Sequence, residues 1–207
     1  MRWLLAGLIM LAGGPLAAQC VTQADLARGV LFDRQGDVTG RAIAAEGVVR
    51  VDYDYGAQGY TDRRDMVQGV YETARLAESA PPDVIGLWSS RTTAITWQGR
   101  FPPPTPGTGW QSTANTRWEM SDFSGVPQRG RERFSVSYTF LAQTEARLGG
   151  CTYAVIPVEV RWRGRDSDQT HRHAYFPALG LAIETQVTYH LTGNVSTHGI
   201  TGLRAAP

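Results

Sequence analysis

The chain has 207 residues, of which 42% are hydrophobic, and its 20 basic and 19 acidic side chains give a formal net charge of +1. This balance excludes the basic excess that is typical of proteins that bind nucleic acid or anionic membranes. The length suits a single domain with a full hydrophobic core.

The first 18 residues have the pattern of a secretory signal peptide. Arg2 supplies a positive start, residues 3–12 form an apolar run too short to span a bilayer, and small residues precede an expected cleavage site after Ala18. No later stretch is long and apolar enough for a membrane helix, so we expect a mature chain without a transmembrane segment. Its expected location is the periplasm of a Gram-negative bacterium, or outside the cell. The alternative is a lipoprotein signal, with Cys20 acylated as the first mature residue.

The sequence contains two cysteines, Cys20 and Cys151. An even pair without Cys-x-x-Cys spacing, in an exported chain, predicts one structural disulfide and neither a redox nor a zinc site. Closing a loop of about 130 residues would stabilise the fold by on the order of 4–5 kcal/mol at most in the loop-entropy model. If Cys20 carried a lipid instead, Cys151 would have no partner.

Residues 151–191 have the clearest strand pattern in the sequence. Apolar residues alternate with charged ones over residues 158–163, which is typical of a half-buried strand. A polar turn leads to a returning strand at residues 170–176, and a turn with proline and glycine leads to a third strand at residues 181–191. These signals predict an antiparallel meander with one apolar and one polar face.

Most of the remaining chain also alternates, which predicts eight or nine antiparallel strands. A short helix is expected at residues 22–28, where Thr22 can cap it. We interpret residues 63–78 as strand and not helix, because Gly69 and the β-branched residues disfavour a helix. One uninterrupted strand over residues 132–147 would be about 50 Å long, and strands of this length usually curl. We therefore predict a mainly β fold, with a long-stranded antiparallel curved sheet or open half-barrel and one short N-terminal helix.

The segment 175–181 (Tyr-Phe-Pro-Ala-Leu-Gly-Leu), between a polar and an apolar strand, resembles a recurrent hairpin of the lipoprotein-carrier-like periplasmic half-barrel proteins. The resemblance covers residues 154–191 and the general strand pattern. It implies a single domain over residues 19–207, built as a sheet around an apolar concavity that holds acyl chains. The lid helices of that family have no clear counterpart here, since only residues 22–28 are expected to be helical.

The apolar rows of the expected strands are the candidate ligand-binding residues. Adjacent strands of a meander keep their apolar sides on a common face, so these rows should share the concave surface of the sheet. A large exposed apolar surface on a monomer usually marks a binding site. The candidates are Trp110, Trp118, Phe134, Tyr138, Phe140, Val158, Val160, Trp162, Ile183, Val187 and Tyr189.

His171 and His173 form the sharpest local motif. Residues two apart on a strand project from the same face, so both imidazoles could bind one metal ion. The spacing of other residues selects no further ligand. The preferred interpretation places both histidines on the solvated face of a hairpin, with no metal and no cofactor. Neither a nucleophile motif nor a glycine-rich phosphate loop is present.

We therefore expect an exported, non-catalytic protein that binds an apolar ligand on its concave face. The ligand would be a lipid acyl chain or a hydrophobic segment of an envelope protein, and no nucleic-acid partner is expected. Two alternatives stay open. One is a structural or adaptor protein of the cell envelope whose concavity is filled by its own side chains. The other is a metal-dependent hydrolase that uses His171 and His173.

Overall fold

The computed structural model describes residues 20–81, 83 and 86–207. Within these residues, segments in which apolar and polar residues alternate form fourteen strands. The signal-peptide prediction for residues 1–18 lies outside the described residues. Two short 3-10 helices accompany the strands, η1 (Gln23–Ala27) and η2 (Gly56–Gln58). The strands are β1 (Val30–Arg34), β2 (Val38–Ala45), β3 (Val48–Asp54), β4 (Tyr60–Val67), β5 (Tyr71–Ser79), β6 (Ser89–Trp97), β7 (Gly109–Asp122), β8 (Gln128–Phe140), β9 (Thr144–Leu148), β10 (Cys151–Arg163), β11 (Asp168–Phe176), β12 (Leu181–Tyr189), β13 (Asn194–Thr197) and β14 (Ile200–Ala205).

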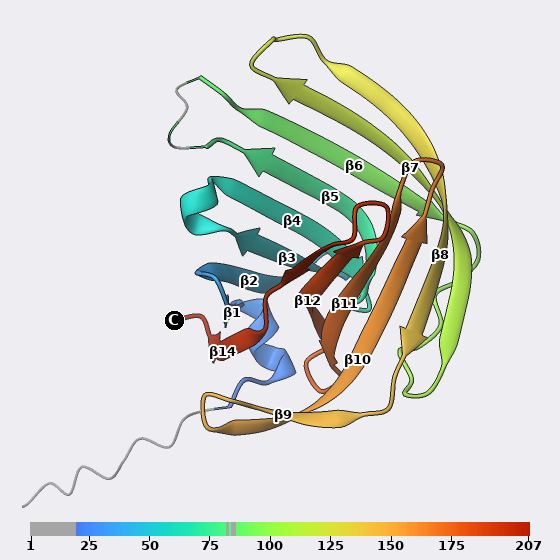
Figure 1. The fold of residues 1–207 in the computed structure, drawn as a ribbon. Coiled ribbons are helices and arrows are strands. Elements are labelled where there is room, and N and C mark those ends of the chain that lie inside the picture. Colours follow the sequence, from blue (N-terminus) through green and yellow to red (C-terminus); the bar gives the residue numbers. More distant parts are fainter. Residues whose placement is uncertain (1–19, 82, 84–85) are drawn as a thin grey trace, which may run out of the picture.

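The strands of the described chain form one open antiparallel sheet, which confirms the predicted fold class (Figure 1). Their order is β13-β12-β11-β10-β8-β7-β6-β5-β4-β3-β2-β1-β14, with β9 paired to the start of β10. Neighbours in the sequence are therefore neighbours in the sheet, except where β8 meets β10 and β14 meets β1. A meander of this kind is built from short connections between antiparallel strands.

The sheet curls until its two ends meet at one point. β13 and β14 follow each other in the sequence but lie at opposite ends of the strand order. The two residues between them bridge those ends: His198 N donates to Thr185 O of β12, and Gly199 O accepts from Gln35 N, next to β1. The curl encloses the concave side of the sheet.

The concave side is the hydrophobic core, and the chain itself fills most of it. β10, β11 and β12 cross the inner side of the strands from β2 to β6 (Figure 1). These strands form an inner and an outer layer, and aromatic rings pack between them. For example, the ring centroids of Trp97 of β6 and Trp162 of β10 are 5.3 Å apart. The core includes Phe32, Val51, Tyr53, Met66, Tyr71, Tyr138, Phe140, Val158, Val160 and Phe176.

The N-terminal segment is attached to this core by the predicted disulfide. Cys20 and Cys151 are bonded, which ties the start of the described chain to the start of β10. Next to the disulfide, Val21 N donates to the hydroxyl of Tyr153 at 3.0 Å. The expected capping by Thr22 is also present, because Thr22 and Asp25 form a capping box, although the helix that they cap is of the 3-10 type.

Two expected strands are divided in the structure. Residues 63–78 are strand, as predicted, but a turn at Gln68 and Gly69 splits them between β4 and β5. Residues 132–147 are interrupted at residues 141–143, which connect β8 to β9, although Leu141 N still donates to Pro157 O of β10. β2, β13 and β14 were not expected either, so the predicted number of strands was too low.

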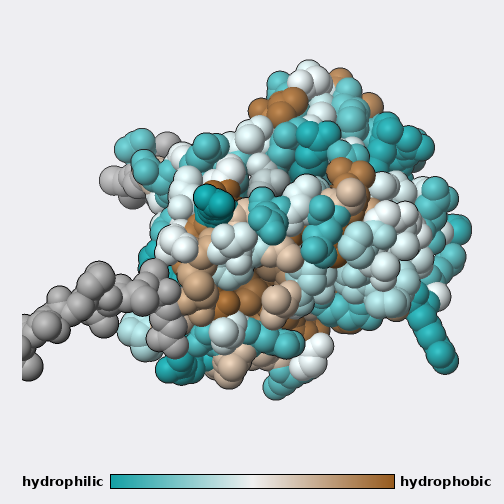
Figure 2. All heavy atoms as spheres, turned by 90° about the horizontal axis from the view of Figure 1, so that it is seen from below, coloured by the Kyte–Doolittle hydropathy of each residue, from teal (hydrophilic) through white to brown (hydrophobic). Residues whose placement is uncertain are grey.

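The outer surface is mixed in character. Figure 2, which views the molecule from below, shows hydrophobic residues gathered near the middle of that face, with hydrophilic residues around them. Within the described ranges, helices are too short and too polar to span a lipid bilayer.

Candidate functional site

Charged side chains lie in the interior where β4 faces β12. Arg64 is 2% exposed, and its guanidinium donates to Asp62 at 2.6 Å and to Glu184 of β12 at 2.7 Å. Arg75 of β5 donates to the other oxygen of Asp62 at 2.7 Å, and His171 Nδ1 lies 2.6 Å from Glu184 Oε2. We call these five residues the interior cluster. Buried charges are tolerated when they are paired in this way.

Two β-bulges turn glutamates toward the interior cluster. Thr73 is an extra residue in β5, so that Glu72 projects inward beside Arg64, with 4.0 Å between its Oε2 and the Nε of the arginine. Thr185 is an extra residue in β12, and Glu184 is thereby brought to the inner face. Bulges commonly re-aim side chains in this manner.

The charges around Arg64 determine how its carboxylate neighbours titrate. Burial acts to raise the pKa of Glu184, but the Arg64 guanidinium and the hydrogen bond from His171 outweigh it and hold that pKa well below its usual value. Burial also opposes ionisation of Asp62, whose pKa is nevertheless lowered by Arg64 and Arg75. For Glu72, burial dominates and the pKa is raised. Asp62 and Glu184 are therefore ionised at neutral pH, and Glu72 is the first of the three to take up a proton.

At the free edge of β12, backbone hydrogen-bonding groups are satisfied by side chains of the opposite layer. β13 pairs with β12 only from Gln186 onward, so the backbone before it has no strand partner on that side. Glu184 N donates to the Tyr53 hydroxyl at 3.1 Å, and its carbonyl accepts from Arg34 Nη1 at 2.6 Å. Arg34 also lies 4.6 Å over the Tyr53 ring, a cation–π geometry.

His171 and His173 point into the interior, so their expected placement on a solvated face was wrong. They are 8% and 6% exposed. Their cross-strand neighbours are Val160 and Val158 of β10, which place both imidazoles on the apolar side of the sheet. Burial lowers the pKa of His173 to about 3, so this side chain is neutral. Among the described residues, no group of three or more His, Cys, Asp and Glu side chains is arranged to hold a metal ion.

A cavity of about 480 Å³ opens beside the interior cluster, between the two layers. We call it the inter-layer cavity. Its lining includes the apolar residues Ala77, Ile95, Phe134 and Trp162 and the ionisable residues Glu72, Arg75, Arg91, Glu132 and His171. Cavities of roughly 300–1,000 Å³ with apolar walls and a few polar groups are typical of small-molecule sites.

Two charged residues of this cavity have no ionic partner within the part of the chain that the structure describes. Arg91 lies 4.6 Å over the ring of Trp118 but forms no ion pair, and the Glu132 carboxylate forms none either. Burial lowers the pKa of Arg91, the sign of a cation that has lost part of its water. Both groups are therefore available to a charged guest.

The structure separates the predicted concave residues into three groups. Phe134 and Trp162 line the inter-layer cavity. Trp118 lies half-buried beneath Arg91, and Tyr189 is 45% exposed at the end of β12. The others pack within or against the hydrophobic core; they are Trp110, Tyr138, Phe140, Val158, Val160, Ile183 and Val187.

The bulge at Thr185 also corrects the predicted face of β12. Strict alternation placed Ile183 and Val187 on one side and Glu184 on the other. In the structure Glu184 and Val187 pair with the two inward histidines, and Ile183 faces the opposite side, where it is buried as well. Sequence alternation cannot detect an extra residue in a strand.

Sequence reasoning missed the interior cluster apart from His171. One signal was present: Asp62 and Arg64 share the phase of Met66, which is an apolar residue in the same strand. Charged residues at core-phase positions of a strand usually mark a buried pair or a functional group.

Comparison with known proteins adds no relative: no protein-family model, curated protein or solved structure matches this chain. The site is therefore interpreted from its own residues and geometry.

Proposed function

We propose that the protein is an exported binding protein that holds a small amphiphile in the inter-layer cavity. One observation carries the proposal: the two layers, which otherwise fill the concave side, leave a cavity of about 480 Å³ that is lined by both aromatic rings and charged side chains. The proposal agrees with the resemblance to lipoprotein-carrier-like half-barrel proteins. The signal peptide predicted over residues 1–18 and the Cys20–Cys151 disulfide favour the periplasm as its location.

The cavity favours a ligand with a short apolar portion and a charged head group. Ile95, Phe134 and Trp162 offer the apolar contact, and Arg91 and Glu132 offer charges of both signs. The larger apolar rows of the sheet are already covered by β10, β11 and β12. A full-length acyl chain would therefore enter the cavity only in part.

A fluorescent fatty-acid probe tests the proposal. We expect saturable binding by the mature protein and a loss of at least tenfold in affinity for Thr93→Trp, because Thr93 faces the cavity and the indole ring would occupy it. Thr92→Trp is the matched control, since Thr92 lies one residue away on the outer face and should leave the affinity within about twofold. Equal affinities of both variants, or no saturable binding by the wild type, would refute the proposal.

The burial of the concave rows favours a second candidate. A structural or adaptor protein of the envelope needs no ligand, and its core would be filled by its own side chains, as most of this one is. Thr93→Trp separates the two functions, because in an adaptor the substitution would change stability without any loss of a bound guest. A hydrolase built on His171 and His173 has no support in this geometry, since His171 is engaged by Glu184.

A further inference from the structure

Arginines on the outer face of the sheet follow a regular arrangement. In four places an arginine lies directly opposite a carboxylate on the neighbouring strand and forms an ion pair with it. These pairs are Arg50–Asp65 at 2.7 Å, Arg63–Asp52 at 2.6 Å, Arg129–Glu119 at 3.0 Å and Arg172–Glu159 at 2.8 Å. Opposite charges at such positions stabilise a sheet.

Three neighbouring arginines of β7 and β8 break this arrangement. Arg117 lies directly opposite Arg131, and Arg133 lies opposite Asn115. All three are exposed, and none has an ion-pair partner among the residues that the structure describes. Like charges directly opposite each other destabilise a sheet, so the fold gains nothing from this placement.

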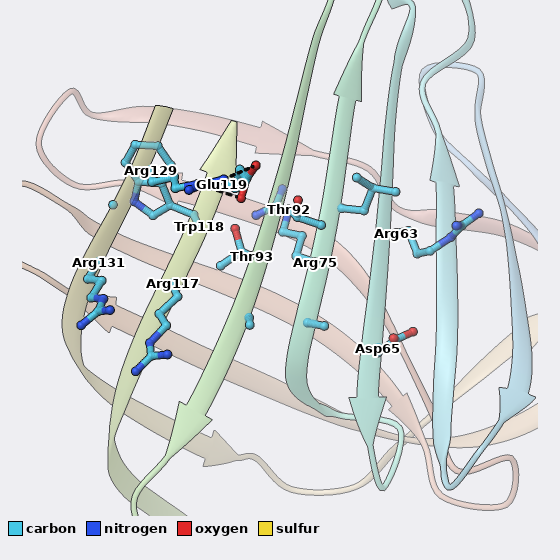
Figure 3. A pocket seen from close by; sticks show the side chains of 14 residues that line it. Arg63, Asp65, Arg75, Thr92, Thr93, Arg117, Trp118, Glu119, Arg129 and Arg131 are labelled. Carbon is cyan, nitrogen blue, oxygen red and sulfur yellow. Dashed lines mark hydrogen bonds and ion pairs between the residues drawn. The ribbon is translucent and has the colours of Figure 1, made fainter. Parts of the chain in front are cut away.

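A groove of about 690 Å³ begins at Arg117 and Arg131 and crosses the outer face from β8 to β4. Between its charged residues, the lining of the groove includes the small residues Ala74, Ala94 and Gly130. Figure 3 shows Arg117 and Arg131 extending in the same direction from adjacent strands, while Arg129 turns away to its partner Glu119. The groove is therefore an open channel with uncompensated positive charge along one side.

Charge and shape together indicate the occupant. The missing element at Arg117, Arg131 and Arg133 is the carboxylate that other outer-face arginines have, and the planar guanidinium matches a carboxylate in a bidentate way. A hollow channel that crosses several strands fits an extended polypeptide better than it fits the flat surface of a bilayer.

We propose that this groove binds an extended acidic segment of another polypeptide, whose carboxylates pair with Arg117 and Arg131. The partner would complete the row of cross-strand ion pairs that the sheet leaves unfinished. This surface is on the opposite side of the sheet from the inter-layer cavity, so the two sites could be occupied together.

A labelled peptide of ten residues, with Glu at every second position and Thr between, is the probe. We expect fluorescence anisotropy to show binding that weakens as the salt concentration rises. The double variant Arg117→Gln/Arg131→Gln should bind at least tenfold more weakly. The control Arg161→Gln/Arg172→Gln removes the same charge from paired positions elsewhere on the outer face, and should bind within about twofold of the wild type.

Several results would overturn the proposal. Equal losses in both double variants would show diffuse charge attraction and no specific groove. Wild-type protein that binds the peptide no better than its Gln-for-Glu counterpart would show that carboxylates are not recognised. Binding of vesicles with anionic phospholipid through Arg117 and Arg131, without binding of the peptide, would assign the surface to a membrane. Circular dichroism of every variant verifies that the sheet is intact.

Discussion

Arg64 is the residue that joins the two layers of the protein by charge. It is held between Asp62 on its own strand and Glu184 on β12. A buried pair of this kind often adds little net stability, because removing the charges from water is costly. The pair affects the alignment of the two layers. A slip of β12 by one residue would move Glu184 away from Arg64 and leave this carboxylate buried without its partner, at a cost of several kcal/mol.

His173 predicts how stability changes in mild acid. Its pKa of about 3 in the folded protein lies below the usual value of 6.5, so between these values the unfolded chain binds a proton that the folded chain cannot. The free energy of unfolding should therefore fall as pH drops below 6.5, with His173 contributing a loss on the order of 2 kcal/mol between pH 7 and pH 5. Glu72, with its raised pKa, acts in the opposite direction, since its contribution is lost as pH rises.

Comparing urea denaturation of wild type and His173→Phe at pH 5 and pH 7 isolates the contribution of His173 to the free energy of unfolding. The variant should lose less stability over the interval than the wild type does. His190→Gln is the control, because His190 is exposed and hydrogen-bonded to Thr170, and it should keep the wild-type difference. A His173→Phe protein with the full wild-type loss would show that His173 is not the source.

At the level of elements, the turn between β4 and β5 holds the turn between β11 and β12 in place. Gly69 O accepts from Ala182 N at 2.8 Å, and a Cβ added to Gly69 would lie 1.8 Å from the carbonyl oxygen of Gly180. Gly69 also has a φ of 69°, in the left-handed region. Glycine at this position is therefore required both by the backbone conformation and by the close approach of β12.

Comparing Gly69→Ala with Gly47→Ala separates the cost of backbone strain from the cost of the close contact. Gly47 has a φ of 84° with nothing near its missing Cβ, so Gly47→Ala should cost about 1–2 kcal/mol from backbone strain alone. Gly69→Ala adds a clash with backbone and should lower the urea midpoint considerably more. Similar midpoints for both variants would mean that the contact between the two hairpins is not rigid.

The sequence predicts the elements well where alternation is regular. The strand at β10, the capping pair Thr22 and Asp25, and the disulfide follow from local pattern or from a count of cysteines. The site depends on two single-residue insertions, Thr73 and Thr185, which turn Glu72 and Glu184 inward. Such bulges have no period of their own, and the pairing that reveals them lies elsewhere in the chain.

At the level of the whole molecule, the sheet is long enough to fold over itself. Regular alternation predicted one shared concave face, and that face exists, but β10, β11 and β12 occupy most of it (Figure 1). The curvature of the outer layer and the crossing of the inner one depend on contacts between residues as distant as Arg34 and Glu184. Local pattern does not specify these contacts, so the extent of filling could not be derived from it.

The central claim is that the inter-layer cavity holds a guest, and native mass spectrometry of the protein tests it most directly. We expect wild-type protein, produced from the full sequence in a bacterial host and purified without detergent, to carry a noncovalent adduct that is released on denaturation. The adduct should be absent from Thr93→Trp and present in Thr92→Trp. Wild-type protein of bare-chain mass, or an adduct retained by Thr93→Trp, would contradict the account.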